Sequence, residues 1–212
     1  MKAKVWVALI GFSFVGWPAV STANTGEKIR NDKVLVNEET LSPGERVAIS
    51  GEYPDMIVQM TDGAIEVSQA GGAVLKTTVK RGDIAYRSAQ KRTIKNVGPS
   101  ALIFVHVEFL TKGLDEVWGM KGLAPNYKIL IENRYARSYD IRIPAQTSEP
   151  QHTHHARVIV SLAGAELEHI LPDGTKQPST LKTGEIAWRP AATHIGHNMG
   201  HTDLWVIAIE PK

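Results

Sequence analysis

Histidines gather in two short segments of the C-terminal half of the chain. Six of the eight histidines fall there: His152, His154, His155, His194, His197 and His201. Two histidines at i and i+2 on a strand point to the same face, and a second strand returning beside the first could supply a third imidazole. Imidazole is the commonest protein ligand of Zn, Fe, Ni, Mn and Cu. The spacing therefore favours a metal site over the alternative of a solvated polar loop.

The remaining histidines fit this pattern less well. His155 has odd parity relative to His152 and should face away from the site. His197 follows His194 by three residues in an expected turn, so it could replace or supplement His194 as a ligand. His201 is expected in a solvated turn, and His169 is expected to face outward without a special role.

The N-terminus has the features of a secretory signal peptide. Basic Met1–Lys4 precede an almost wholly apolar run, Val5–Val20, and the small residues Ser21–Ala23. An uncleaved membrane anchor is the alternative, but the run is short for a span and contains Pro18. We predict cleavage after residue 23, no stable membrane anchoring afterwards, and a periplasmic or secreted mature protein.

Composition narrows the partners and the ligand chemistry. The chain contains no cysteine, which excludes lipoprotein anchoring, disulfides and thiolate ligands. A net charge of +2 is too small to indicate a nucleic-acid partner. With 42% hydrophobic residues, a sizeable core can form.

An internal repeat organises the mature chain. Gly82–Gly98 aligns with Gly184–Gly200 without a gap, and both copies end in an apolar strand that closes on glutamate, Glu108 or Glu210. Because two copies are too few for a solenoid, the repeat indicates a duplicated domain.

Each copy consists of short alternating or β-branched runs separated by turn signals such as Pro43-Gly44 and Asp173-Gly174. This pattern is typical of an all-β sandwich or barrel. The predicted units are 24–110 and 128–212. The linker between them is 111–127, with one helical turn around Leu114–Trp118.

Two motifs in the second copy carry a family resemblance. One reads Pro150-Gln-His152-Thr-His154, then continues through Arg157 to Gly164 at the end of the strand; the other reads Gly184, five residues, Pro190, then His194 and Asn198. They resemble the two motifs of the cupins. The chain looks like a bicupin, which implies two tandem jelly-roll β-barrels after the signal peptide.

The resemblance also implies a metal site, with one departure. The acidic ligand of the first motif is absent, and Arg157 stands in its place. The implied ligands are therefore His152, His154 and His194, holding one divalent transition metal, Fe, Zn, Ni or Mn.

A neutral ligand set leaves more positive charge on the metal and favours an anionic substrate. We predict that Arg157 and Arg189 bind the anion. The alternative for Arg157 is a surface cation paired with Glu149 or Glu168.

The first copy lacks these histidines. Gly51–Pro54 occupies the region of His152–His155, and Arg92 and Lys95 stand where His194 and His197 stand. We expect a metal-free barrel there. With Tyr53, the basic pair could form an anion pocket, but a purely structural role is favoured.

No residue is a convincing general base or nucleophile, so catalytic residues stay unassigned. The resemblance implies dioxygenase-like or isomerase/lyase chemistry on a small carboxylate-bearing molecule. The alternatives are a non-catalytic protein that binds a small ligand or metal, and a structural module that forms a homodimer through edge strands.

Overall fold

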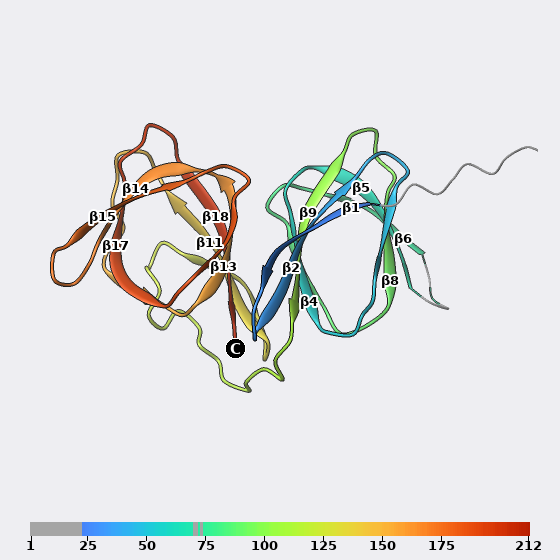
Figure 1. Cartoon of the computed structure of the whole chain (residues 1–212), viewed down its shortest axis with the longest axis horizontal. Coiled ribbons are helices and arrows are strands. Elements are labelled where there is room, and N and C mark those ends of the chain that lie inside the picture. The colour runs from blue at the N-terminus through green and yellow to red at the C-terminus, as the bar shows by residue number, and fades with distance from the viewer. Residues whose placement is uncertain (1–22, 70–71, 73) are drawn as a thin grey trace, which may run out of the picture.

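Two β-sandwiches lie side by side in the computed structural model, which describes residues 23–69, 72 and 74–212 (Figure 1). The predicted all-β fold with two tandem jelly rolls is confirmed. Except for Ala23, the predicted signal peptide lies outside the described residues. Within the described part of the chain, no helix has the length and apolar character needed to cross a membrane.

The two sandwiches repeat one strand topology. The strands of the first are β1 (Asn24–Arg30), β2 (Val34–Leu41), β3 (Arg46–Ile49), β4 (Asp55–Gln59), β5 (Gly63–Gln69), β6 (Val74–Val79), β7 (Ile84–Arg87), β8 (Arg92–Asn96) and β9 (Leu102–Phe109). Those of the second are β10 (Lys128–Glu132), β11 (Ala136–Ile143), β12 (His152–His154), β13 (Arg157–Ala163), β14 (Ala165–Ile170), β15 (Lys176–Leu181), β16 (Ile186–Arg189), β17 (Ala192–Asn198) and β18 (Leu204–Pro211). The sheet orders β1-β2-β9-β4-β7 and β3-β8-β5-β6 recur as β10-β11-β18-β13-β16 and β12-β17-β14-β15.

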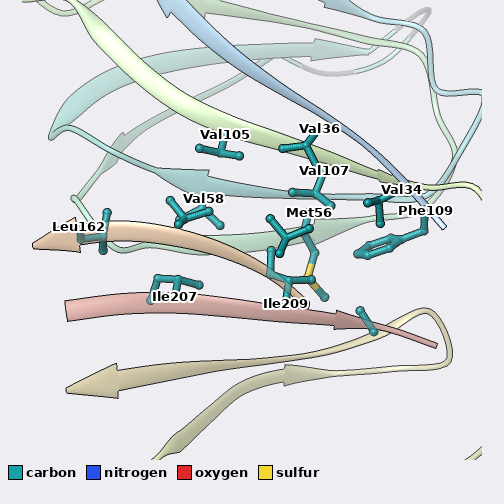
Figure 2. Packing of buried hydrophobic residues seen from close by; sticks show 13 residues of the cluster. Val34, Val36, Met56, Val58, Val105, Val107, Phe109, Leu162, Ile207 and Ile209 are labelled. Atoms are coloured by element: carbon teal, nitrogen blue, oxygen red, sulfur yellow. The ribbon is translucent and has the colours of Figure 1, made fainter. Parts of the chain in front are cut away.

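The five-stranded sheets of the two barrels share a hydrophobic core. Met56 and Val58 of β4 pack in one cluster with Leu162 of β13 and Ile207 of β18 (Figure 2). Alternate residues of these strands face their own barrel, so β4 and β13 are buried on both faces. This explains why their sequences are continuous apolar runs rather than alternating ones.

The inside of the second barrel holds a separate core. Ile141, Ile159 and Val206 pack there with residues of the predicted linker, namely Leu123 and Tyr127. The segment 111–127 therefore does more than connect the barrels, because its second half closes the second one. The expected helical turn at Leu114–Trp118 is wrong, since no helical residue occurs in that range.

The predicted short runs coincide with most strands to within a few residues, but β1, β6, β8 and β15 were not predicted, and β17 lies where a turn was expected. The sequences of β6 and β15, VLKTTV and KQPSTL, contain several polar residues, and both strands lie at sheet edges with mostly exposed side chains. A strand that buries neither face leaves no apolar alternation to detect.

Candidate metal centre

Strands β12 and β17 bring three imidazoles together inside the second barrel. His152 pairs across the two strands with His194, and His154 lies two residues further along the same face. Their possible ligand nitrogens all lie within 4.8 Å of one another, and each residue is at most 7% exposed. Parity alone explains this grouping, because Thr153 between them points outward and bonds Thr193.

Backbone carbonyls orient two of the three rings. Nδ1 of His152 lies 3.2 Å from the carbonyl oxygen of Pro150, and Nδ1 of His154 lies 2.9 Å from that of His155. Donation through Nδ1 leaves the Nε2 lone pair of each ring as the one that can bind a metal ion, the usual arrangement of metal-binding histidines, although the Tyr127 hydroxyl lies 3.2 Å from Nε2 of His152.

Burial keeps the three rings neutral. It lowers the pKa of His152 to about 4, that of His154 to about 2 and that of His194 to about 3. The nearby charge of Arg157 lowers each pKa further. Neutral imidazole is the form that binds metal, so the group is ready to bind across the physiological pH range.

A carboxylate that the sequence analysis did not assign to the site lies beside the triad. Glu149 Oε1 is 3.6 Å from His152 Nε2, and the residue is 5% exposed. The carboxylate occupies space that Gly196 leaves open, because a Cβ on Gly196 would overlap Oε1 and lie 3.0 Å from Cδ. Burial raises the pKa of Glu149 to about 7, against the lowering effects of the Tyr127 hydroxyl and Arg157.

Arg157 faces the interior, so the surface alternative is wrong. It is 7% exposed, and its Nη1 donates to the Tyr139 hydroxyl at 2.7 Å. Neither Glu149 nor Glu168 forms an ion pair with it within 4.0 Å: Glu149 lies beside His152, and Glu168 pairs with Lys176. Arg189 is half-buried and pairs with Glu185 at 3.0 Å.

His169 is the second correction. The predicted outward orientation is wrong, because its ring centroid lies 4.5 Å from that of His194. It shares the inward face of β14 with Ala165 and Leu167, and β14 pairs it with Gly196. Burial lowers its pKa, and Arg157 and Arg189 lower it further.

The other histidines stay outside the triad. His197 lies in β17 rather than in a turn and has opposite parity to His194. His155 is exposed and stacks on Trp118 at 4.1 Å. His201 is exposed in a bend.

The connecting segment holds the edge of β12 that faces away from β17. Thr153 N donates to the carbonyl of Gly122 at 2.7 Å, and the Tyr127 hydroxyl lies 3.2 Å from His152 Nε2. Gly122 has a φ of +83°, and a Cβ there would lie 2.7 Å from the Thr153 carbonyl oxygen. Only glycine allows this close approach without strain.

A cavity of about 390 Å³ opens beside the triad. His154, His194, His169, Glu149, Arg157 and Arg189 line it together with apolar side chains. This volume lies in the range of small-molecule sites. The arrangement can therefore hold a small ligand against a metal ion bound by the histidines.

The first barrel carries a different cluster at the matching positions. Arg92, the counterpart of His194, forms a buried ion pair with Asp55 at 2.6 Å. Lys95 lies three residues further along β8, on the opposite face from Arg92. The alternative of a joint anion pocket formed by these two cations is therefore wrong.

No protein-family model and no curated protein sequence matches the chain. Solved structures do. AerE from Microcystis aeruginosa aligns over 90% of this chain and 98% of its own, with 14% identity and a TM-score of 0.62. A cupin 2 conserved barrel domain protein from Leptotrichia buccalis aligns over 99% of both chains, with 16% identity and a TM-score of 0.61.

A variant of Bacillus subtilis oxalate decarboxylase aligns over 84% of this chain and 69% of its own, with 13% identity and a TM-score of 0.59. At such identities the likeness concerns the fold alone. The chain has the cupin fold in two tandem copies, and the predicted bicupin architecture is confirmed.

Proposed function

We propose that the protein is an exported metalloprotein that binds one divalent transition metal ion through His152, His154 and His194 and acts on a small carboxylate-bearing molecule. The observation that carries this proposal is the convergence of three buried, neutral imidazoles, two of which, those of His154 and His194, line a cavity. Three imidazoles suit Fe, Zn, Ni or Mn and leave positions open for a substrate or water.

The residues around the triad fit a metal ion. Glu149 can supply a negative charge next to His152, either as a further ligand or by accepting a hydrogen bond from a ligand. The buried guanidinium of Arg157 carries a charge that an incoming carboxylate would neutralise, in the bidentate geometry that arginine favours. Tyr127 holds the ring of His152 in place.

When bound, such an ion supplies Lewis-acid polarisation or an O₂-binding position. Dioxygenase-like and isomerase/lyase reactions are the proposed classes. Among the structural neighbours, oxalate decarboxylase acts on a carboxylate and, in one study, contains Mn(II) centres, which makes carboxylate chemistry in this fold reasonable. The alternative is a non-catalytic role, in which this protein binds the same anion without converting it and uses the same residues.

Metal content of the purified protein tests the proposal. His194→Ala is compared with His197→Ala, which removes the same side chain three residues further along the same strand but outside the triad. We expect about one equivalent of metal in the wild type and in His197→Ala, and little in His194→Ala. Circular dichroism shows whether each variant is folded.

Equal trace metal in all three folded proteins would contradict the metalloprotein proposal. Bound iron would direct substrate tests toward O₂-dependent reactions, and zinc, nickel or manganese toward lyase or isomerase reactions. Cell fractionation tests export, which rests on residues 1–23 of the sequence.

A further inference from the structure

Three buried polar atoms at the cavity wall have no hydrogen-bond partner among the described residues. They are Nε of Arg157, Oε2 of Glu149 and Nδ1 of His169, and all three residues line the cavity beside the triad. Buried polar groups are normally paired, and a set left unpaired around one cavity marks the positions where a ligand binds. The chemistry of these atoms therefore describes the ligand.

Arg157 requires an anion. A guanidinium only donates hydrogen bonds, and this one uses Nη1 on the uncharged Tyr139 hydroxyl. It is 7% exposed and has no carboxylate within 4.0 Å in the described part of the chain. Glu149 and Glu210 act on this charge only from beyond ion-pair distance, so a carboxylate that reached the guanidinium would be stabilised strongly here.

Glu149 requires a hydrogen-bond donor. Its Oε1 lies 3.6 Å from His152 Nε2, and the Tyr127 hydroxyl also interacts with the carboxylate, but Oε2 has no hydrogen-bond partner among the described residues. An ionised carboxylate only accepts hydrogen bonds, so the group that meets Oε2 must carry N–H or O–H. A second carboxylate on the ligand would instead be repelled. Nδ1 of His169 can accept or donate, and so tolerates either partner.

Most of the remaining wall is apolar, although Tyr127, Gln177, Ser179 and Arg189 also line it. The apolar part is formed mainly by aliphatic side chains from four strands: Ile141, Ile143, Ile159, Leu167, Leu204 and Val206. These side chains would bury a hydrocarbon body.

We propose that the cavity binds a small monocarboxylic acid with an apolar body and an amino or hydroxyl group near the carboxylate. Arg157 binds the carboxylate, Glu149 accepts from the amino or hydroxyl group, and the aliphatic wall encloses the body. This inference rests on the proposed function in that the acid binds beside the metal ion, and it adds the two groups that select the acid.

Three matched probes test the proposal by isothermal titration calorimetry on the metal-loaded protein. They are 4-methylpentanoate, 2-hydroxy-4-methylpentanoate and leucine, which differ only at one position, and malonate serves as the dicarboxylate. We expect the hydroxy acid or the amino acid to bind at least about tenfold more tightly than 4-methylpentanoate, and malonate to bind most weakly. Whichever of the two binds more tightly identifies the donor.

Variants assign the preference to its residue. Glu149→Met keeps the length of the side chain and removes the acceptor, so the advantage of the hydroxy or amino acid over 4-methylpentanoate should disappear. Glu166→Met removes an exposed glutamate of β14 and should change nothing. Arg157→Met should weaken all the acids together.

The comparison of probes on the wild-type protein remains decisive even if Glu149→Met also loses metal. Equal affinity for the three matched probes would overturn this inference and leave the proposed function standing. Absence of binding by every acid to a protein that does contain metal would overturn both the inference and the carboxylate part of the proposed function. Loss of the metal site itself is read separately, from the His194→Ala experiment.

Discussion

Replacing Gly196 with alanine displaces one carboxylate from the metal site without changing any charge. A methyl group at this position would overlap Oε1 of Glu149 and lie 3.0 Å from its Cδ. The backbone of Gly196 does not have a positive φ, so alanine fits the strand conformation itself. The atom that must move is the end of a flexible side chain, and we therefore expect Glu149 to rotate away from His152.

The size of the effect follows from the place of Glu149 next to a ligand. Groups that support metal ligands typically contribute 10–100-fold to metal affinity. Gly196→Ala should therefore raise the metal dissociation constant by about 10–100-fold, equivalent to about 1.4–2.7 kcal/mol. Unfolding of the metal-free protein should change by less than about 1 kcal/mol, because the strand stays intact and only one side chain shifts.

Competition with a chromogenic chelator measures the dissociation constant. Gly26→Ala is the matched control, because Gly26 also lies in a strand, and its nearest neighbour to a new Cβ is the end of Lys28 at 3.9 Å. Unchanged metal affinity in a folded Gly196→Ala protein would refute the conclusion that Glu149 supports the site.

Three further predictions concern the segment beside the site, its pH dependence and its buried ion pair. Gly122→Ala should weaken metal binding about tenfold, because the new methyl group would push on β12, which carries His152 and His154. Gly174→Ala is the control: its φ of +84° matches the +83° of Gly122, but the space around it is open, so metal binding should not change. Chelator competition measures both variants. The pKa of Glu149 is raised to about 7, so below that pH a bound metal ion must displace a proton from it. Metal affinity should therefore fall by up to about tenfold per pH unit between pH 7 and 5 in the wild type, but not in Glu149→Gln. A flat profile in the wild type would contradict this. Arg137→Met leaves Glu210 buried without its partner at 2.5 Å and should lower the free energy of unfolding by about 3–5 kcal/mol, measured by urea denaturation; a loss below about 1 kcal/mol would show that the pair is not important for stability.

The sequence was sufficient for the architecture because the repeat and the alternation of apolar residues both depend on local spacing. The aligned segments Gly82–Gly98 and Gly184–Gly200 imply equivalent barrels, and the two barrels do have equivalent strand orders. The grouping of His152, His154 and His194 could likewise be anticipated from parity and from the return of a neighbouring strand.

The missed residues depend on contacts that spacing does not encode. Glu149 precedes β12 in an irregular segment where parity has no meaning, and its position depends on the missing side chain of Gly196 across the sheet. His169 could have been placed by its alternation with Leu167, had the buried face of β14 been identified first. The sequence could not predict whether Arg157 is buried, because an arginine can form a surface ion pair or line a cavity.

The contrast between the two barrels is consistent with the proposed site in the second barrel. In the strand register, Asp55 lies opposite Arg87 of β7, and Arg157 lies opposite Arg189 of β16. Asp55 and Arg157 therefore hold equivalent positions in the two barrels. In the first barrel Asp55 forms a buried ion pair with Arg92, the residue that stands in place of His194. Each charge there has its counter-ion within the protein, which removes the need for an external one. In the second barrel the cation at the same position has no such partner and faces a cavity beside three metal-binding groups, so a ligand is needed to complete its interactions.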